Sequence, residues 1–575
     1  MSIAFENLGK VITRYLKKDF EILTWDNLEE YYLDLAQREI NSLNDLTRWL
    51  EDRSELESAT QENLAWRYIR MSCDTANEKI SEDYSFFVRE IEPKIAPQDN
   101  ILNQKFLACT FSAELKDTAY NNYLRSVRQR VEIFREENIP LIAELQDMQQ
   151  QFSTISGSQT VMHDGQELTL QQASALLRHT NRSVREGIYN LITTRRLQDK
   201  EKLDELYSKL ITLRHKIALN AGFKNYRDYA FAALNRFDYT VNNCFHFHGS
   251  ISSEIVPLTT KMDMQRLTQL GYPSLKPWDT VVDPSGKPPV KPFATAAEMV
   301  SKTIECLHEI DPQLAECITY LEKLNRLDLE SRKGKAPGGY NYPLYQTGVP
   351  FIFMNNTGQL RDLVTMVHEC GHAVHSVLTH GLPFYELKSC PSEVAELASM
   401  SMELITMEHW HHFITDAEEL RRAKIEHLKG IIEILPWIAT VDAFQHWVYE
   451  NPTHSTMERE ENWNRIYENF ASPVIDWTGF EKVKTNTWQK QIHIFDSPFY
   501  YIEYGMAQLG ALAVWKNYKQ DPDKCIADYK AALSLGYTKS IGDIYSTAGA
   551  RFDFSSGYIH ELTGFLSEEI KKLTQ

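Results

Sequence analysis

The chain has 575 residues, of which 43% are hydrophobic and 24% charged, a composition typical of a globular protein with a sizeable core. Its formal net charge of −18 argues against nucleic acid and anionic membranes as partners, because an acidic surface is repelled by both. By length alone the chain has room for about four domains, although a large helical protein can have fewer.

The sequence also bears on location. The N-terminal residues include an early Glu6 and no continuous apolar segment, so we expect no secretory signal. No apolar run is long enough for a membrane-spanning helix. The eight cysteines are dispersed without a CxxC pair, which favours reduced thiols over a disulfide framework. We therefore expect a cytoplasmic protein.

The N-terminal part of the chain is predicted to be almost entirely helical. Segments 28–50, 62–80 and 112–151 place apolar residues three and four apart, with charged residues between them. Residues 159–168 alternate around Asp164-Gly165 instead, which predicts a two-residue β-hairpin. We expect a soft lobe boundary near residue 190, dividing the chain into residues 1–190 and 191–575.

Helices and one strand are expected before the centre of the chain. The prolines of residues 272–293 predict an irregular segment, after which Thr295 and Glu298 suggest a capping box and a helix to about residue 327. The run VPFIFMN (349–355) predicts a strand. Its free edge could pair with an extended peptide, or it could be an internal strand, and the sequence favours neither interpretation.

Residues 363–380 predict a buried helix that carries the motif H-E-x-x-H at His368, Glu369 and His372. Residues four apart share one face of a helix, so both imidazoles point the same way, as two ligands of a catalytic zinc do. Glu369 is then placed to act as a general base. The alternative is that two unrelated histidines happen to lie on an ordinary helix. That arrangement would leave polar groups unpaired among apolar residues.

A catalytic zinc usually has a third protein ligand. The metzincin pattern is excluded, because the sequence lacks its further Gly and His at the required spacing. A second helix, residues 392–403, carries Glu393, Glu396 and Glu403 near one face. Spacing alone does not choose between Glu393 and Glu396 as the ligand.

A further cluster follows at His493 and the run SPFYYIEYG (497–505). Tyr501 and Tyr504 lie three apart, on one face of a helix that Pro498 could begin. Tyrosine hydroxyls and histidine N–H groups can stabilise a developing oxyanion, although a tyrosine cluster more often belongs to a core.

Taken together, these segments resemble the thimet oligopeptidase / oligoendopeptidase F family of zinc metallopeptidases. The resemblance is carried by HECGH (368–372) and SEVAELAS (392–399). The segments KAPGGY (335–340), VPFIFMN (349–355) and SPFYYIEYGMAQLGA (497–511) are most similar to the oligoendopeptidase F side, near the Pz-peptidase-like members. The length and helical pattern agree over the whole chain, and the motifs are strongest from 335 to 511.

The resemblance implies roles for individual residues. It implies Glu396 as the third zinc ligand and Glu369 as the general base. It implies that His493 holds the substrate or the tetrahedral intermediate, that Tyr504 stabilises the oxyanion, and that Tyr501 binds nearby substrate groups.

The resemblance also implies a fold and a set of partners. The implied fold is mainly α, with two helical lobes flanking a deep substrate channel and a small β element beside the zinc-binding helix. Residues 191–575 would be the catalytic part, with one zinc ion per chain. Short unfolded peptides are the implied partners, and a monomer or small homo-oligomer the implied state.

The function expected on this basis is that of a zinc-dependent endopeptidase hydrolysing internal bonds of short oligopeptides. A zinc carboxypeptidase or dipeptidase on the same scaffold is the alternative within enzymes. The alternative from another class is a non-catalytic peptide-binding protein with a vestigial metal site. The intact set of His368, Glu369, His372 and Glu396 argues against it, because a binding protein would tolerate the loss of any of them.

Overall fold

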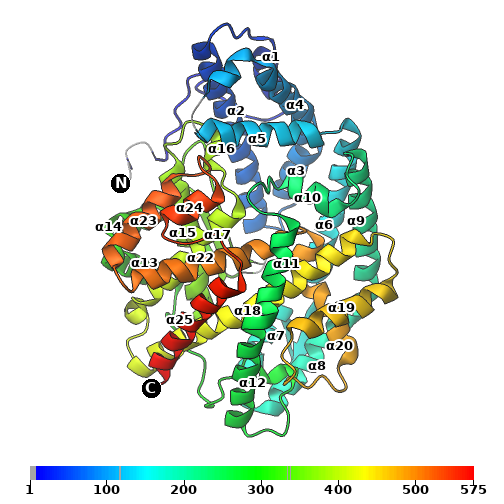
Figure 1. Ribbon diagram of the computed structural model, residues 1–575, viewed down its shortest axis with the longest axis vertical. Coiled ribbons are helices and arrows are strands. Elements are labelled where there is room, and N and C mark those ends of the chain that lie inside the picture. The colour runs from blue at the N-terminus through cyan, green and yellow to red at the C-terminus, as the bar shows by residue number, and fades with distance from the viewer. Residues whose placement is uncertain (1–4, 6–7, 116–117, 333, 337) are drawn as a thin grey trace.

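A computed structural model describes residues 5, 8–115, 118–332, 334–336 and 338–575. The chain is mostly helical with two small sheets, which confirms the expected mainly α fold class (Figure 1). The N-terminal helices are α1 (Asp26–Gln37), α2 (Leu43–Cys73), α3 (Glu78–Phe86), α4 (Glu92–Ala108), α5 (Thr118–Ile133) and α6 (Ile139–Gly157). The next elements are β1 (Thr160–His163), β2 (Gln166–Thr169), α7 (Leu170–Ala175), α8 (Arg182–Gln198), α9 (Lys200–Asn220), α10 (Tyr226–Ala233), α11 (Val241–Ser250), α12 (Val256–Leu270), α13 (Ala296–Ile310) and α14 (Pro312–Lys323).

The remaining elements build the centre and the C-terminal part of the molecule. The central ones are β3 (Leu327–Glu330), β4 (Tyr340–Tyr342), β5 (Phe351–Asn356), α15 (Leu360–Thr379), α16 (Tyr385–Lys388) and α17 (Ser392–Met407). The C-terminal ones are α18 (Ala417–Glu450), α19 (Thr456–Phe470), α20 (Glu481–Thr485), α21 (Ile492–Phe495), α22 (Ile502–Tyr518), α23 (Pro522–Ser534), α24 (Ile541–Thr547) and α25 (Ser556–Thr574).

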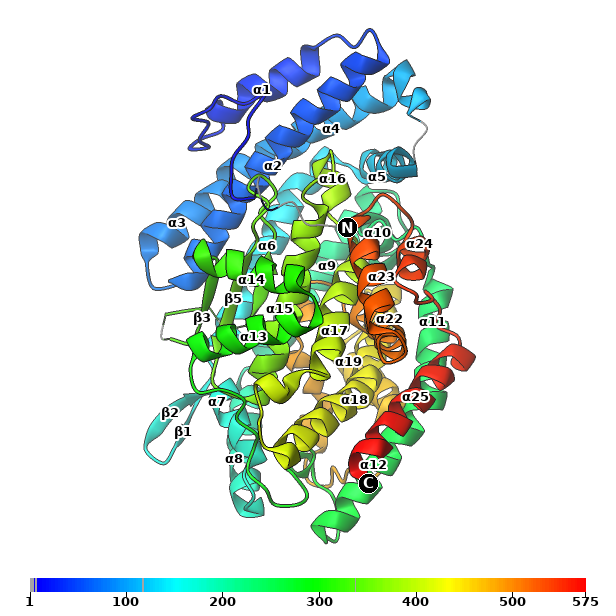
Figure 2. The same cartoon turned by 90° about the vertical axis from the view of Figure 1, so that its left-hand side faces the viewer.

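Two hydrophobic cores account for most of the packing. The larger one joins α6, α9 and most of the helices that follow, including α15, α17, α18 and α22. A separate core lies among α1 to α5, where residues between Leu16 and Val127 are buried together with Phe384 and Leu387 at α16. Figure 2 shows α1, α2 and α4 at the top of the molecule, with α16 between them and the centre. The expected lobe boundary at residue 190 stays a prediction.

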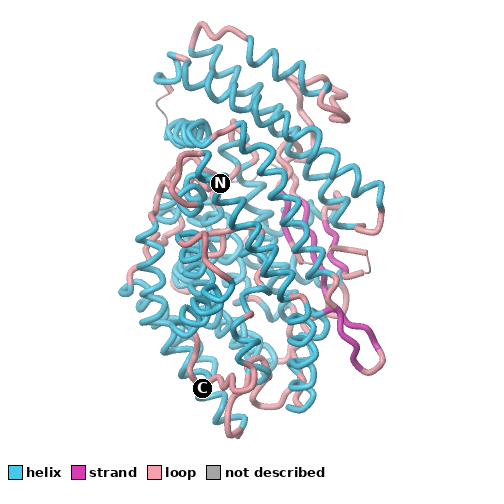
Figure 3. The backbone as a smooth tube through the Cα atoms, turned by 90° about the vertical axis from the view of Figure 1, so that its right-hand side faces the viewer, coloured by secondary structure: helices cyan, strands magenta, loops and turns pink. Residues whose placement is uncertain are grey.

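The predicted hairpin at 159–168 is confirmed. Strands β1 and β2 pair antiparallel, and Asp164 and Gly165 between them have φ values of 49° and 77°. Positive φ at both central residues is what a type I′ turn requires, and Gly adopts it without a steric cost. The hairpin projects from the side of the molecule (Figure 3).

The helix expected from 295 to 327 is divided in two. Thr295 caps α13 as predicted, because its hydroxyl accepts the backbone N–H of Glu298. The Glu298 carboxylate also accepts from the backbone N–H of Ala294, the residue before the cap. Asp311 then ends α13, and its side chain caps α14 by accepting from Gln313.

The second sheet corrects an expectation about residues 349–355. Strand β5 is the central strand, parallel to β3 on one side and antiparallel to β4 on the other. Both edges of β5 are therefore occupied, and the hypothesis that this strand offers a free edge to a peptide is wrong. In this sheet the short strand β4 lies at the edge.

Two expectations from composition can be compared with the structure. Among the described residues, no helix has the length and apolarity needed to cross a membrane. The eight cysteines are free thiols, as their dispersed positions predicted. Cys370, inside the H-E-x-x-H motif, is fully buried, which agrees with a packing role.

Candidate active site

At the start of the helix that carries the motif, backbone N–H groups find a hydrogen-bond acceptor. Asp362 accepts hydrogen bonds from the backbone N–H groups of Thr357 and Gln359, at 2.8 and 2.9 Å. These bonds pair donors that the first helical turn would otherwise leave free. Helix α15 then runs through the larger core, with its apolar residues buried and His368 and His372 directed towards α17.

Close contact between α15 and α17 depends on Gly371. A Cβ atom at this position would lie 2.6 Å from Ser399 Cα and 2.7 Å from the Ala398 carbonyl oxygen. Both contacts are with the backbone of α17, so a larger residue could be accommodated only by moving the helices apart. The Gly of the motif therefore permits the approach that brings α17 carboxylates next to the α15 histidines.

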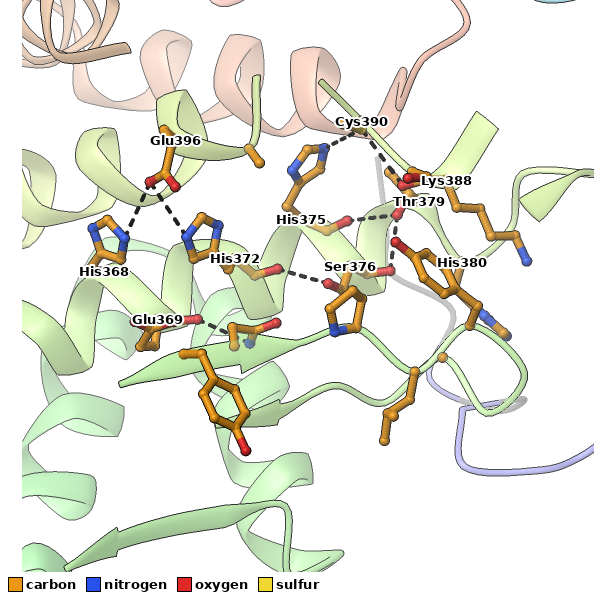
Figure 4. A pocket seen from close by; sticks show the side chains of 18 of the residues that line it. His368, Glu369, His372, His375, Ser376, Thr379, His380, Lys388, Cys390 and Glu396 are labelled. Atoms are coloured by element: carbon orange, nitrogen blue, oxygen red, sulfur yellow. Dashed lines mark hydrogen bonds and ion pairs between the residues drawn. The ribbon is translucent and has the colours of Figure 1, made fainter. Parts of the chain in front are cut away.

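Three predicted ligands converge at this helix contact (Figure 4). The donor atoms of His368, His372 and Glu396 all lie within 4.8 Å of one another. Glu396 Oε2 is 3.4 Å from His368 Nε2 and 3.7 Å from His372 Nε2. Of the two acidic candidates that the sequence left open, it is Glu396, and not Glu393, that shares this group.

Hydrogen bonds orient two of these side chains, His368 and Glu396. Glu403 Oε1 accepts from His368 Nδ1 at 2.6 Å, which turns the opposite ring nitrogen, Nε2, towards Glu396. Ser399 Oγ donates to Glu396 Oε2 and Tyr500 OH donates to Glu396 Oε1, both at 3.0 Å. The sequence pattern places Glu403 near the same helical face as Glu396 but indicates no role for it. It does not predict the contact of Tyr500 with Glu396.

The electrostatics suit a cation. Burial by itself would raise the pKa of Glu396, but the nearby His372 and His368 rings and the Ser399 hydroxyl outweigh it and hold the pKa at about 2. Burial lowers the pKa of His372 to about 4, so this ring is neutral at pH 7 and retains a lone pair for a ligand. A carboxylate and a neutral imidazole are both forms that bind a metal.

Glu369 differs from the three converging residues. Its side chain is buried, and its Oε2 atom has no hydrogen-bond partner within the described part of the chain. Burial raises the pKa of this carboxyl group to about 7, with the charge on His368 opposing the rise. A buried carboxylate with one free oxygen, beside a cluster of potential metal ligands, is suited to exchanging a proton near neutral pH.

A cavity of about 430 Å³ opens beside these residues. Its lining includes Glu369 and Glu396 at one end and His380 and Lys388 at the other, and Figure 4 shows the two ends. One wall is made by the edge strand β4 and the residues after it, Pro343 to Tyr345. The predicted catalytic carboxylate therefore faces a space that is bounded in part by β4, an edge strand of the sheet as far as the described residues define it.

The predicted His493 and tyrosine cluster is assembled, although only part of it reaches the cavity. The His493 ring contacts those of Tyr500, Tyr501 and Tyr504, with ring centroids 5.9, 4.8 and 5.8 Å away. As far as the described residues define it, the lining includes Tyr500 and Tyr504 but neither His493 nor Tyr501.

The helix that follows this cluster begins later than Pro498 predicted. Phe499 adopts a left-handed φ of 69°, and α22 starts only at Ile502. This reversal of the backbone directs Tyr500 to Glu396. The sequence gives no signal for a left-handed Phe, which is why the contact of Tyr500 was not predicted.

Comparison with known proteins agrees with this arrangement. The family model "Peptidase family M3" matches residues 175–563, and "Peptidase M3 N-terminal domain" matches residues 17–134. An oligoendopeptidase F homolog of Borreliella burgdorferi is 24% identical over 293 residues, which cover 49% of this chain and 48% of that protein. The matched segments thus span about half the length of such curated relatives.

Solved structures extend the likeness over nearly the whole chain. The structure of Pz peptidase A with an inhibitor superposes with a TM-score of 0.91 at 25% identity, covering 97% of this chain and 99% of that one. Oligoendopeptidase-F from Enterococcus faecium, at 15% identity and a TM-score of 0.66 over 96% and 97% of the two chains, shares the fold. The family match covers well over half of the sequence, and the chain belongs to peptidase family M3.

Proposed function

We propose that this protein is a zinc-dependent endopeptidase that hydrolyses internal peptide bonds of short oligopeptides. The observation that carries the proposal is the convergence of His368, His372 and Glu396 beside the buried carboxylate of Glu369, whose Oε2 atom has no hydrogen-bond partner among the described residues. Family membership and the names of the similar proteins, oligoendopeptidase F and Pz peptidase A, support the same activity.

The three converging residues fit a zinc ion. Two imidazole nitrogens and one carboxylate oxygen make the His₂Glu set found in several catalytic zinc sites, with a fourth position left for the reaction. The hydrogen bond between Glu403 and His368 is the outer support that metal-binding histidines usually have. When bound, zinc supplies Lewis-acid chemistry, which polarises a carbonyl and lowers the pKa of water.

Glu369 is proposed to move the proton. Its carboxylate takes a proton from the attacking water and passes it to the nitrogen of the leaving amine. A pKa of about 7, which burial produces, lets one group both accept and release a proton near neutral pH. Tyr504, at the cavity wall, and His493, behind it, are proposed to stabilise the oxyanion that forms on the carbonyl oxygen when water attacks the carbonyl carbon, and Tyr501 is proposed to bind nearby substrate groups.

The cavity fits an extended peptide. The edge strand β4 forms part of its wall, and an unpaired strand edge can bind a peptide backbone by adding a strand. A space of about 430 Å³ holds only a few residues, which favours short unfolded chains over folded proteins. We further propose one catalytic zinc per chain and a reducing, cytoplasmic setting, in keeping with the free cysteines.

One observation favours a second candidate, a carboxypeptidase or dipeptidase activity. Lys388 lies at the end of the cavity away from Glu369, where an ammonium group could bind the carboxylate of a peptide's C-terminus. Cleavage would then occur at a fixed distance from that end.

The test is cleavage of an internally quenched peptide of about ten residues with both ends blocked. Internal cuts, identified by mass, that are abolished by a chelator and restored by zinc would support the endopeptidase. Trimming of free-ended peptides alone would support the second candidate. Glu369→Gln should retain the metal and lose nearly all turnover, and substantial turnover in that variant would contradict its role as base.

A further inference from the structure

A second group of potential ligands lies away from the active site, between α11 and α18. Cys244, Asp442 and His446 are buried, and their donor atoms all lie within 4.8 Å of one another. A fourth residue, His248, is also buried and places its Nε2 atom 2.7 Å from Asp442 Oδ2. Figure 1 shows α11 crossing α18, and the two helices are in contact.

The sequence spacing of these four residues allows their side chains to meet between the two helices. Cys244 and His248 are four apart on α11, and Asp442 and His446 are four apart on α18. Each pair therefore lies on one face of its helix, and the two faces meet where the helices cross. This arrangement repeats, in another place, the helix-to-helix geometry of the candidate active site.

Hydrogen bonds within the protein leave this group incompletely satisfied. Asp442 Oδ2 is close to His248 Nε2, and His446 Nε2 lies 3.2 Å from the same oxygen. Asp442 Oδ1 and His446 Nδ1 nevertheless have no hydrogen-bond partner in the described part of the chain. Buried polar atoms without partners are rare in native proteins, and one explanation is a bound ion.

Aromatic rings surround the group. The His446 ring contacts Phe245 and Phe499, with centroids 5.0 and 5.2 Å away, and His248 contacts Phe470 at 6.3 Å. A divalent cation with the Asp442 carboxylate and a Cys244 thiolate would form a neutral unit, which an apolar core tolerates better than an isolated carboxylate.

We propose that Cys244, Asp442 and His446 bind a second, structural zinc ion, with His248 orienting the Asp442 carboxylate from outside. Sulfur, nitrogen and oxygen donors together favour zinc among the common divalent ions. Binding releases the Cys244 thiol proton to solvent, because the thiolate is the form that coordinates. The ion links α11 to α18 without a disulfide.

The site has a structural connection to the active site through Phe499. Gln445, beside His446, accepts the Phe499 backbone N–H at 3.0 Å, and the next residue, Tyr500, donates to Glu396. Fixing this part of α18 therefore helps to hold the left-handed turn from which Tyr500 reaches Glu396. The residues of the second site touch neither Glu396 nor its histidine partners directly.

The experiment measures the metal content of the purified full-length protein and the spectrum of its cobalt-substituted form. We expect two zinc ions per chain. Cobalt bound by a thiolate has a near-ultraviolet charge-transfer band, whereas the set of His368, His372 and Glu396 contains no sulfur and cannot produce one. Glu396→Gln should lower the content to one ion and keep the band.

Two matched cysteine variants show which thiolate produces the charge-transfer band. Cys244→Ser should abolish it and remove one ion per chain. Cys390→Ser should leave it unchanged, although this thiol lies 3.3 Å from His375 at the active-site cavity. A wild-type protein with one ion and no thiolate band overturns the proposal, whether or not Cys244→Ser folds. A band that persists in Cys244→Ser overturns it equally.

Discussion

His493 is held by two hydrogen bonds in series that determine which ring nitrogen carries a proton. Trp437 Nε1 donates to Gln491 Oε1 at 2.9 Å, so the amide nitrogen of Gln491 is the atom 2.7 Å from His493 Nδ1. Nδ1 therefore accepts a hydrogen bond. Burial lowers the pKa of His493 to about 4, so the ring is neutral at pH 7 and its proton lies on Nε2.

Gln491→Glu should reverse this arrangement. A carboxylate at position 491 accepts from Nδ1–H, which leaves Nε2 of the neutral ring without the proton it would donate to an oxyanion. We expect kcat for peptide cleavage at pH 8 to fall by roughly 10² to 10³, the usual effect of removing one such donor, with little change in metal content. Gln491→Met, which imposes no tautomer, is the control and should lose less activity. Equal kcat values for the Glu variant and wild type would remove His493 from the oxyanion role.

Lys388 gives the cavity a pH-dependent charge. Burial lowers its pKa to about 8, so the ammonium group is charged below pH 8 and becomes neutral as the pH rises through that value. KM for peptides with a free C-terminal carboxylate should therefore increase about fivefold between pH 7 and pH 9, the worth of one modest ion pair. Peptides with an amidated C-terminus should show no such increase.

Lys388→Arg is the matched variant for that pH dependence. An Arg side chain stays charged throughout this range, so KM for the free-ended peptide should become independent of pH. A wild-type profile that is the same for free and amidated peptides would show that Lys388 does not bind the C-terminus.

At the scale of elements, the separation of α15 from α17 is the quantity on which the proposed metal site depends. Gly371→Ala places a Cβ atom 2.6 Å from Ser399 Cα, and the helices must move apart to accept it. We expect a loss of about 1–3 kcal/mol in the free energy of unfolding, the usual cost of overpacking. Zinc affinity, measured by competition with a chelator, should fall at least tenfold because Glu396 moves away from the histidines.

Gly430 provides the control for that substitution. It lies inside α18, and apart from the adjoining backbone of its own helix no atom of the described residues is within 4 Å of the position that its Cβ would take. Gly430→Ala should therefore leave zinc affinity unchanged and raise the free energy of unfolding by up to about 1 kcal/mol, the difference in helix propensity. The same zinc affinity in Gly371→Ala and wild type would contradict the argument from helix separation.

The elements also show how far the sequence could predict this protein. Helix α15 and the hairpin at Asp164-Gly165 follow local rules, namely apolar periodicity and turn chemistry, and both were predicted. The position of β5 was not, because strand order depends on pairing with β3 and β4, which no local pattern encodes. Tyr500 was missed for a similar reason, since its direction depends on the left-handed Phe499.

At the scale of the whole molecule, the N-terminal helices hold one wall of the active-site cavity. Phe384, just before α16, and Leu387, within it, are buried in the core of α1 to α5, whereas Lys388, the last residue of α16, lines the cavity. An ion pair of 2.7 Å between Arg130 and Glu386 joins the same segments. Loosening the N-terminal core should therefore affect peptide binding from a distance.

Phe384→Ala tests this connection between the N-terminal core and the cavity. The Phe384 ring is 3% exposed and packs against Tyr120 and Tyr123, so its removal should cost about 3–5 kcal/mol in the stability of this core, measured by urea unfolding. KM should rise while zinc content stays constant, because α16 is displaced and the ligands on α15 and α17 belong to the other core. Phe86→Ala, which truncates a 40% exposed ring on α3, should change neither quantity appreciably. An unaltered KM in a measurably destabilised Phe384→Ala protein would mean that the larger core alone positions the cavity wall.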